Sequence, residues 1–222
     1  MRKELTSLDL YYLTKELKEL EKGKIEKIYQ QTASPDFLFK LYVPDKGKKQ
    51  LKISLPSFTY LTEFKERFPE VPPGFCTFLR KYIQGGRITE VKQHAFERIL
   101  EIQIDSRKQH WTLLLELFSK GNMLLLTEEG KIKGLLKGQN WSSRTVRGGV
   151  QYDYPPTRFD PVAASDKELL EKLQSSTKSL VRGLATQVGL GGVYAEEVCA
   201  HLSLDKETLL NQIPEADLKK VV

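Results

Sequence analysis

Apolar residues recur every three or four positions in two stretches of the chain, which is the spacing of one face of a helix. The first stretch is leucine-rich, follows Thr6-Ser7 and ends at Gly23. The second opens after Pro72-Pro73 and ends at Gly85-Gly86. Because proline is favoured at the start of a helix and glycine just after its end, we predict helices after Thr6 and over 74–83.

Elsewhere in the first 136 residues apolar and polar positions alternate between turn residues, the pattern of half-buried strands. Short polar turns between the runs favour antiparallel pairing. The predicted strands are 24–30, 36–43, 50–55, 95–105, 110–118, 123–127 and 131–136.

A weak internal repeat links the two helices to the strands. Gly23–Gln30 and Gly86–Gln93 share a pattern of Gly, a basic residue, Ile, two polar residues, a β-branched residue, any residue and Gln. Each copy follows a predicted helix. This indicates a duplicated unit of a helix followed by strands, packed as two β layers, although chance similarity over eight residues remains an alternative.

The pattern changes after residue 134. Residues 134–161 show no regular period, and 161–166 resemble a linker that ends in a helix N-cap. Helices are then predicted over 167–173, 177–187, 195–202 and 205–212. We therefore predict an α+β fold: a two-layer antiparallel β domain flanked by helices over 1–160, and a small all-α domain over 165–222.

Composition excludes several classes of protein. No apolar run approaches the roughly 20 residues that span a bilayer, and Met1-Arg2-Lys3-Glu4 leads into no signal core, so we expect a cytoplasmic protein without membrane contact. Cys76 and Cys199 cannot build a four-cysteine zinc site, and the three histidines are scattered. We expect no metal and no cofactor.

The positive charge is concentrated in the first part of the chain. Residues 1–160 hold 28 Lys and Arg against 20 Asp and Glu, whereas 161–222 hold 7 against 9. A basic excess in one domain favours a polyanion such as nucleic acid, but it is also typical of a solvated lysine face. Lys46, Lys48 and Lys49 lie in a turn and are interpreted as such a solvated hairpin tip.

Val188–Ala195 joins two predicted helices with the spacing of a helix-hairpin-helix. In that motif Gly189 and Gly191 adopt backbone angles closed to other residues, and free amides at the second helix can hold a phosphate. A plain turn between helices is the alternative. Glu196 and Glu197, placed where a phosphate would approach, argue against phosphate binding by this motif.

Arg98 falls on the apolar face of the predicted strand 95–105, together with Phe96 and Leu100. It is either an anion contact that lines a cleft or an arginine that reaches water at the strand end. Asp9 is similarly open: Thr6-Ser7-Leu8-Asp9 fits a capping box, which explains the carboxylate without a ligand.

Arg144, Arg147 and Arg158 alternate with aromatic residues in the irregular stretch 134–161. Arginines beside Trp141, Tyr152 and Tyr154 are suited to phosphates and stacked bases, although mixed loops of this kind are common. Motifs of nucleophilic, phosphate-loop or metalloprotease catalysis are absent from the sequence, so we expect a binding protein and not an enzyme.

Several local sequences together resemble the N-terminal domain of the NFACT family, the RqcH-like ribosome quality control proteins that are also called fibronectin-binding protein A-like. The residues after position 165 resemble the family's helix-hairpin-helix module. The matching segments are Leu8-Asp9, Glu16-Leu17, Gly23-Lys24-Ile25, Ile28-Tyr29-Gln30, Pro73-Gly74-Phe75, Phe78–Lys81, Gly85–Ile88, Glu97-Arg98-Ile99, Glu116-Leu117 and Gly121-Asn122.

The resemblance implies a fold similar to the N-terminal domain of formamidopyrimidine-DNA glycosylase. It implies binding of tRNA and of a large ribosomal subunit obstructed by peptidyl-tRNA, with recruitment of charged alanyl-tRNA for untemplated tailing of the stalled chain. It also implies tRNA contacts for Asp9, Glu97 and Arg98, with Glu97 in place of the family's usual aspartate.

Two alternatives to this function follow from the fold and the family name. A DNA glycosylase or lyase would need an N-terminal proline and a four-cysteine zinc finger, which the sequence lacks, so no DNA partner is expected. A matrix-protein-binding adhesin rests on the older family name alone. The family's coiled coil and C-terminal RNA-binding domain do not follow within these 222 residues, so we expect this chain not to complete the tailing cycle alone.

Overall fold

The computed structural model describes residues 4–140 and 144–221, and these residues form two compact units. The first unit contains Leu10–His94 and Arg98–Pro155 together with the first five residues. The second contains Pro156–Val222 and two short pieces from earlier in the chain, Thr6–Asp9 and Ala95–Glu97.

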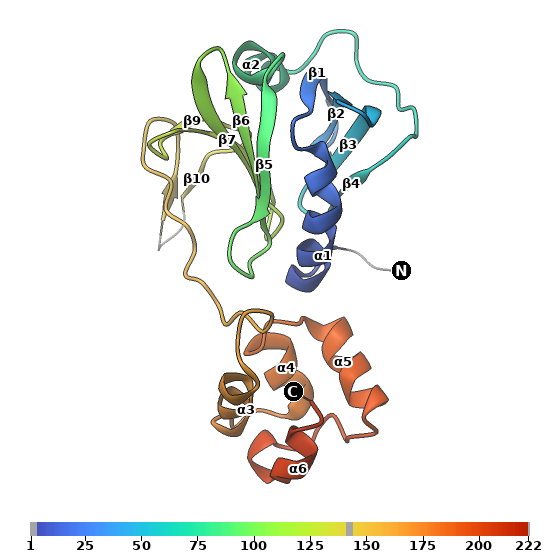
Figure 1. The fold of residues 1–222 in the computed structure, drawn as a ribbon. Coiled ribbons are helices and arrows are strands. Elements are labelled where there is room, and N and C mark those ends of the chain that lie inside the picture. Colours follow the sequence, from blue (N-terminus) through green and yellow to red (C-terminus); the bar gives the residue numbers. More distant parts are fainter. Residues whose placement is uncertain (1–3, 141–143, 222) are drawn as a thin grey trace. The chain divides into compact units, whose positions relative to one another are not determined.

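The first unit is built on a nine-stranded antiparallel sheet with the order β4-β3-β2-β1-β5-β6-β7-β8-β9 (Figure 1). Short turns connect most neighbours in the sheet, as the alternating sequence pattern requires. The strands are β1 (Lys24–Gln30), β2 (Asp36–Val43), β3 (Gly47–Ser54), β4 (Phe58–Leu61), β5 (Arg87–Gln93), β6 (Ile99–Ser106), β7 (Gln109–Glu116), β8 (Asn122–Thr127) and β9 (Ile132–Leu135).

Two helices accompany the sheet. Helix α1 (Ser7–Leu17) continues into the short 3-10 helix η1 (Lys18–Leu20), and α2 (Gly74–Ile83) precedes β5. The apolar faces of both helices and the inner faces of both halves of the sheet contribute to one buried core. That core includes Leu17, Phe39, Leu79, Ile102 and Leu113, so the two halves of the sheet share one interior. The expected two layers are thus halves of one hydrogen-bonded sheet.

The halves meet at β1 and β5 through a symmetric set of backbone hydrogen bonds. Lys24 is the register partner of Arg87, and the two numbers differ by 63. Ile25 N–H donates to the Gly86 carbonyl, and Ile88 N–H donates to the Gly23 carbonyl, each at 2.9 Å. Adding 63 to the donor of the first bond and subtracting 63 from its acceptor gives the second bond, so the junction is related to itself by an approximate two-fold axis.

The same offset of 63 relates most of the first unit to itself. It maps the bounds of β2 onto those of β6, and the bulge after Ile25 in β1 onto the bulge after Ile88 in β5. It also maps the register pair Leu51 and Leu61 onto the observed pair Leu114 and Leu124. The eight-residue sequence repeat therefore marks a duplicated structural unit of a helix and several antiparallel strands.

Some predicted elements differ from the structure. β4, the short pair β10 (Gln139–Asn140) and β11 (Thr145–Val146), and the last helix α6 (Glu215–Leu218) are absent from the sequence prediction. Over 205–212 only the 3-10 helix η2 (Leu210–Gln212) forms. The Asp205 carboxylate there accepts hydrogen bonds from Glu207 N–H and the Thr208 hydroxyl, which closes a turn in place of a longer helix.

The second unit is helical and has a core of its own. It contains α3 (Asp166–Gln174), α4 (Leu180–Thr186) and α5 (Gly192–His201) in addition to η2 and α6. Ser165 and Glu168 form a reciprocal capping box at the start of α3, as the linker sequence predicts. Leu173, Leu184, Ala195 and Leu210 are buried together, so the unit encloses its own apolar cluster.

Candidate nucleic-acid interface

Arg98 lies in the tight connection between β5 and β6 and not inside a strand. His94 N–H donates to the Ile99 carbonyl at 3.0 Å, and β6 begins only at Ile99. Ala95, at a φ of 45°, turns the chain in the left-handed region, so the predicted strand 95–105 is too long at its start. The register argument for Arg98 is therefore wrong, because residues 95–98 supply the return loop.

The Arg98 guanidinium has few partners for a side chain that is only 21% exposed. One of its nitrogens donates to Glu4 Oε2 at 2.8 Å, and that glutamate side chain is 54% exposed. The Nε–H is buried and has no acceptor among the described residues. Since a guanidinium carries five N–H donors, Arg98 retains capacity for a further anion, including an RNA phosphate.

Glu97 belongs to the second unit, and its carboxylate is largely buried. Its Oε1 accepts the Arg158 N–H at 2.9 Å and lies 3.9 Å from the Arg158 Nε. This contact holds the segment after Pro156 in place. The Arg158 side chain itself is 70% exposed, so it remains accessible to a ligand.

Asp9 completes the capping box that the sequence predicts. Its Oδ2 accepts hydrogen bonds from the Thr6 N–H at 2.8 Å and the Thr6 hydroxyl at 2.9 Å, and the Asp9 N–H donates back to that hydroxyl. Within the second unit, the Tyr194 hydroxyl also donates to Asp9 Oδ1 at 2.6 Å. The carboxylate is therefore engaged by protein groups on both oxygens.

The turn between α4 and α5 requires its glycines. Gly189 and Gly191 have φ values of 87° and 80°, which other residues rarely adopt, as the sequence argument predicts. The Gly191 N–H donates to the Ala185 carbonyl at 3.2 Å, so this amide is used within the turn. A Cβ at Gly191 would lie 3.1 Å from Thr6 Cγ2, which belongs to the same unit. The turn is packed against protein at this point.

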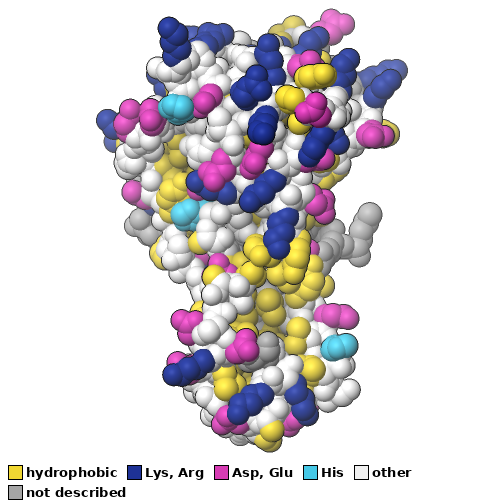
Figure 2. All heavy atoms as spheres, viewed as in Figure 1, with side chains coloured by type: hydrophobic (Ala, Val, Ile, Leu, Met, Phe, Trp, Pro, Cys, Tyr) yellow, Lys and Arg dark blue, Asp and Glu magenta, His cyan; other side chains and the backbone are white. Residues whose placement is uncertain are grey.

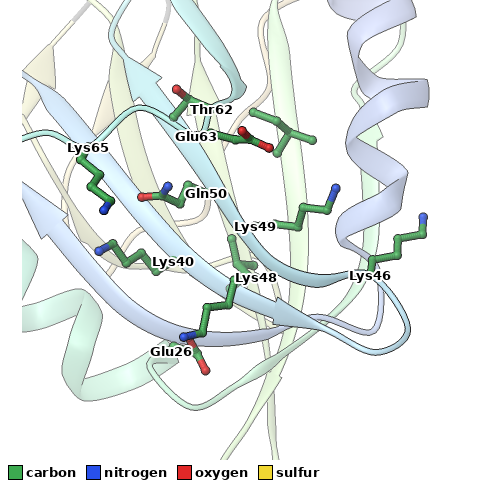
Figure 3. Close-up of a pocket in the computed structure, with 11 residues that line it drawn as sticks. Glu26, Lys40, Lys46, Lys48, Lys49, Gln50, Thr62, Glu63 and Lys65 are labelled. Carbon is green, nitrogen blue, oxygen red and sulfur yellow. The ribbon is translucent and has the colours of Figure 1, made fainter.

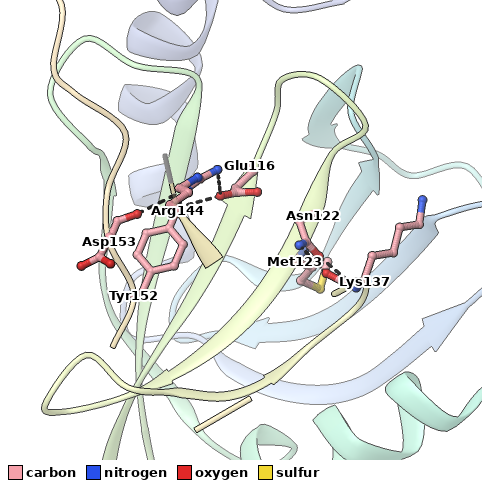
Figure 4. A network of polar contacts seen from close by, with 7 residues as sticks. All are labelled: Glu116, Asn122, Met123, Lys137, Arg144, Tyr152 and Asp153. Carbon is pink, nitrogen blue, oxygen red and sulfur yellow. Dashed lines mark hydrogen bonds and ion pairs between the residues drawn. The ribbon is translucent and has the colours of Figure 1, made fainter. Parts of the chain in front are cut away.

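Arg144 is a buried structural residue, contrary to the sequence interpretation as a nucleic-acid contact. One nitrogen donates to Glu116 Oε1 at 2.8 Å, and the side chains of Arg144 and Glu116 are only 8% and 2% exposed (Figure 4). Another nitrogen donates to the Tyr152 hydroxyl at 3.2 Å and the Asp153 carbonyl at 3.3 Å. Its guanidinium is thus enclosed by acceptors and has no face left for RNA.

Tyr152 and Tyr154 anchor the same segment to two buried carboxylates of the sheet. Tyr152 donates to Glu116 Oε1 and Tyr154 donates to Glu101 Oε1, each at 2.8 Å. Burial raises the pKa of both phenols, and the adjacent carboxylates raise it further. Tyr152 is therefore an interior anchor. Tyr154 is 38% exposed, and its ring is already stacked on His94 at 3.8 Å. Trp141 lies outside the described residues.

Arg147 remains exposed, in contrast to Arg144. It lines an open hollow with Thr145, Val150, Gln151 and Asp153. Exposure leaves Arg147 able to reach a polyanion, and a single arginine in such a hollow defines no binding geometry.

Lys46 and Lys48 are exposed at the β2–β3 turn, as the interpretation of a solvated hairpin tip predicts, and they also line a basic groove on β1–β3. Two hollows of about 520 and 620 Å³ adjoin there and share Lys40, Gln50 and Lys65 (Figure 3). We call their combined surface the lysine groove. Its cationic residues are Lys27, Lys40, Lys46, Lys48, Lys49, Lys65 and Arg80, and its acidic residues are Glu26, Glu63, Glu66 and Glu70.

The signal for this groove is present in the alternation of the strands, although the sequence interpretation missed it. Strand register places Lys48 opposite Tyr42 and Gln50 opposite Lys40. The intervening Leu41 is buried in the core, which leaves the polar set on the other face of the strands. Figure 2 shows Lys and Arg side chains scattered over the visible face of the first unit with acidic residues between them.

The described residues were also compared with the requirements of a metal site and of a membrane-spanning helix. Within 4–140 and 144–221, no three His, Cys, Asp or Glu side chains cluster as metal ligands would. Across the same residues, no helix is both long enough and apolar enough to cross a bilayer.

The first unit is an antiparallel α+β domain that carries a basic surface. Comparison with known proteins identifies the family to which the chain belongs. The family model for the NFACT N-terminal and middle domains matches residues 6–222, so the chain belongs to the NFACT family. The N-terminal domain of the fibronectin-binding protein PavA from Streptococcus pneumoniae has a similar fold. It is 28% identical, with a TM-score of 0.79 over 89% of this chain and 79% of that one.

Curated relatives carry names from ribosome quality control. The archaeal Rqc2 homolog aRqcH of Methanocaldococcus jannaschii is 28% identical over all of this chain and 34% of its own length. The Rqc2 homolog RqcH of Bacillus subtilis is 29% identical over 90% of this chain and 38% of its own. The yeast ribosome quality control complex subunit 2 is 38% identical over 61% of this chain and 13% of its own. The chain thus spans little more than a third of these relatives at most.

Proposed function

We propose that this chain is the NFACT part of a cytosolic ribosome quality control factor. In this role it binds tRNA and a large ribosomal subunit that still holds peptidyl-tRNA, and it helps to recruit alanyl-tRNA for untemplated tailing. The names of the archaeal, bacterial and yeast relatives support this role. The proposed role is binding and not catalysis.

The observation that carries the tRNA-binding part of the proposal is the incomplete hydrogen bonding of Arg98. Its Nε–H has no acceptor in the described part of the chain, and its one ion pair there is to the half-exposed Glu4. The second terminal nitrogen of the guanidinium also has no acceptor among the described residues and is not one of the buried atoms, so an arriving phosphate gains a charge-assisted contact there. Glu97 and Asp9 then have a positioning role. The Glu97 carboxylate accepts the Arg158 N–H and the Asp9 carboxylate accepts the Thr6 N–H, so each orders the backbone that it contacts.

Two finer features of the fold belong to the same proposal. We interpret α4, the glycine turn and α5 as a helix-hairpin-helix, supported by the positive φ of Gly189 and Gly191. We also interpret the duplicated sheet as similar to the glycosylase N-terminal domain. Neither feature supplies a nucleophile, and the buried thiol of Cys76 has a raised pKa because burial disfavours the thiolate.

Substitution of Arg98 by alanine tests the proposal. We expect Arg98→Ala to weaken tRNA binding by about 1–3 kcal/mol, which corresponds to roughly 5- to 150-fold in Kd, because a hydrogen bond to a charged group is lost. Fluorescence anisotropy with labelled tRNA measures the change. Lys120→Ala is the matched control, since it removes one exposed positive charge in a turn of the same unit.

The outcome that contradicts the proposed site is equal tRNA affinity of folded Arg98→Ala and the parent. Titration with fibronectin in parallel tests the adhesin alternative, which the names of the solved neighbours keep open. Fibronectin binding without tRNA binding would favour that alternative.

A further inference from the structure

We propose that the lysine groove is a second RNA-binding surface, which holds the phosphate backbone of an RNA strand and does not read its bases. The groove lies on β1–β3 and the segment that follows β4, apart in sequence from Arg98. This inference rests on the proposed function, because it assumes that the chain works on RNA.

Like charges lie unfavourably close together in the groove. Lys27 and Lys40 are register partners on β1 and β2, so their side chains leave the sheet at neighbouring positions. Like charges directly opposite each other on antiparallel strands destabilise the pair. A bound polyanion neutralises the two charges and removes this repulsion, so phosphate binding in the groove is favoured.

Most of the groove's lysines have no carboxylate partner in the described part of the chain. Among the described residues, no carboxylate oxygen lies within 4 Å of Lys27, Lys40, Lys46, Lys48 or Lys65. Neighbouring lysines of the same strands are neutralised.

The contrast is clear at Lys49 and Lys52. Lys49 pairs with Glu19 at 3.2 Å, and Lys52 pairs with Glu66 at 2.5 Å. Because Glu66 is already held by Lys52, one of the groove's four carboxylates is committed elsewhere. The uncommitted set is therefore cationic. Figure 3 shows four of its lysines, Lys40, Lys46, Lys48 and Lys65, projecting from β2, β3, the turn between them and the segment beyond β4.

The lining of the groove suits backbone phosphate better than bases. The Tyr29 ring is stacked on Phe68 at 5.2 Å, and Lys40 and Arg80 lie 5.3 and 5.7 Å from its centre. With its faces taken by protein groups, this ring offers no platform for a base. The remaining lining includes Gln50 and Thr62, which hydrogen-bond sugars and phosphates. A strongly polar, cationic lining is typical of nucleic-acid interfaces.

The test compares two hairpin tips related by the internal repeat. Lys46→Gln/Lys48→Gln removes two groove charges, and Arg107→Gln/Lys108→Gln removes two charges from the β6–β7 turn at the equivalent place in the other half. Binding of each folded variant to tRNA, and separately to purified large ribosomal subunits, is measured over a range of salt concentrations. Each lost phosphate contact lowers the slope of log K against log salt by about 0.7 to 0.9.

We expect the groove variant to lose about 1.4 to 1.8 of slope with at least one of the two RNAs and the control to keep the parental slope. The RNA that shows the loss is then the source of the bound backbone. Equal slopes for parent and groove variant with both RNAs, or equal losses in groove and control variants, would overturn the proposal. Weaker binding of the groove variant to polyglutamate, with parental binding to both RNAs, would overturn it in favour of an acidic protein partner.

The two proposals fail separately. If the groove variant has a reduced slope and Arg98→Ala binds tRNA with parental affinity, the groove proposal stands and the Arg98 site is contradicted. If the groove variant has the parental slope and Arg98→Ala binds tRNA more weakly, the groove proposal is contradicted and the proposed tRNA site stands.

Discussion

At the scale of single residues, two arginines show why sequence context alone misassigns binding groups. Arg98 and Arg144 are both candidates for contact with RNA on sequence grounds. Arg144 donates to Glu116, Tyr152 and the Asp153 carbonyl, whereas Arg98 donates only to Glu4 among the described residues. The number of protein acceptors around the guanidinium, and not its neighbours in sequence, separates a structural arginine from an available one.

We predict that Arg144→Ala lowers the free energy of unfolding by about 3–5 kcal/mol, because the buried Glu116 carboxylate loses its cation. Urea denaturation measures this change. Arg147→Ala is the control, since Arg147 is exposed on the same segment and a surface substitution changes stability by about 0.5 kcal/mol or less.

The same prediction has a binding readout. Folded Arg144→Ala should bind tRNA as the parent does, because its guanidinium has no free face. A large loss of tRNA affinity with unchanged stability would show that Arg144 contacts RNA after all.

The sequence pattern identifies the Asp9 capping box but cannot place Arg98. A capping box depends on residues three apart, so local pattern is enough to predict it. The position of Arg98 depends on where the β5–β6 connection turns, and Ala95 enters the left-handed region without a glycine or proline signal. Partners such as Glu4, 94 residues away, are not visible in any local window.

At the scale of elements, the junction of β1 and β5 explains why the duplicated unit needs glycine at equivalent positions. The carbonyls of Gly23 and Gly86 accept the two reciprocal hydrogen bonds that join the halves of the sheet. A Cβ at Gly86 would lie 2.9 Å from Ile104 Cγ2 and 3.0 Å from the Asp105 carbonyl oxygen. The close approach leaves no room for a side chain.

Gly86→Ala should therefore lower the free energy of unfolding by about 1–3 kcal/mol, the usual cost of forcing extra volume into a packed site. Gly74→Ala is the control: a Cβ at this position would meet no described atom within 4 Å, and alanine is favoured in a helix, so stability should rise by up to about 1 kcal/mol. Thermal or urea unfolding measures both. Equal stability of Gly86→Ala and the parent would show that the junction adapts.

Elements with strong periodicity are predicted well from sequence, and most elements of four residues or fewer, with the exception of β9, are not. Strands 24–30 and 36–43 and helix 74–83 match the structure because their alternation or helical period runs over seven or more residues. β4 and the pair β10–β11 have four residues or fewer, too few to establish a period. The repeat is detectable in the sequence over eight residues only, although the structural equivalence extends as far as β4 and β8.

At the scale of the whole molecule, the excess of Lys and Arg in the first 160 residues divides between one surface groove and a set of ion pairs. Part of it lines the lysine groove, and part is neutralised in ion pairs such as Lys52 with Glu66. Net charge predicts a polyanionic partner but cannot separate these two populations, since pairing depends on the folded register. The formal charge of +6 therefore predicts only that a polyanion is a favourable partner. The lysines without carboxylate partners show where on the surface it would bind.

The central claim is that this NFACT chain binds the RNAs of stalled translation. Ultraviolet crosslinking of the native protein in its own cells, followed by sequencing of the attached RNA, tests it most directly. We predict enrichment of tRNA, alanine tRNA above all, and of large-subunit ribosomal RNA over messenger RNA. Recovery of no enriched RNA, or of messenger RNA alone, would contradict the account.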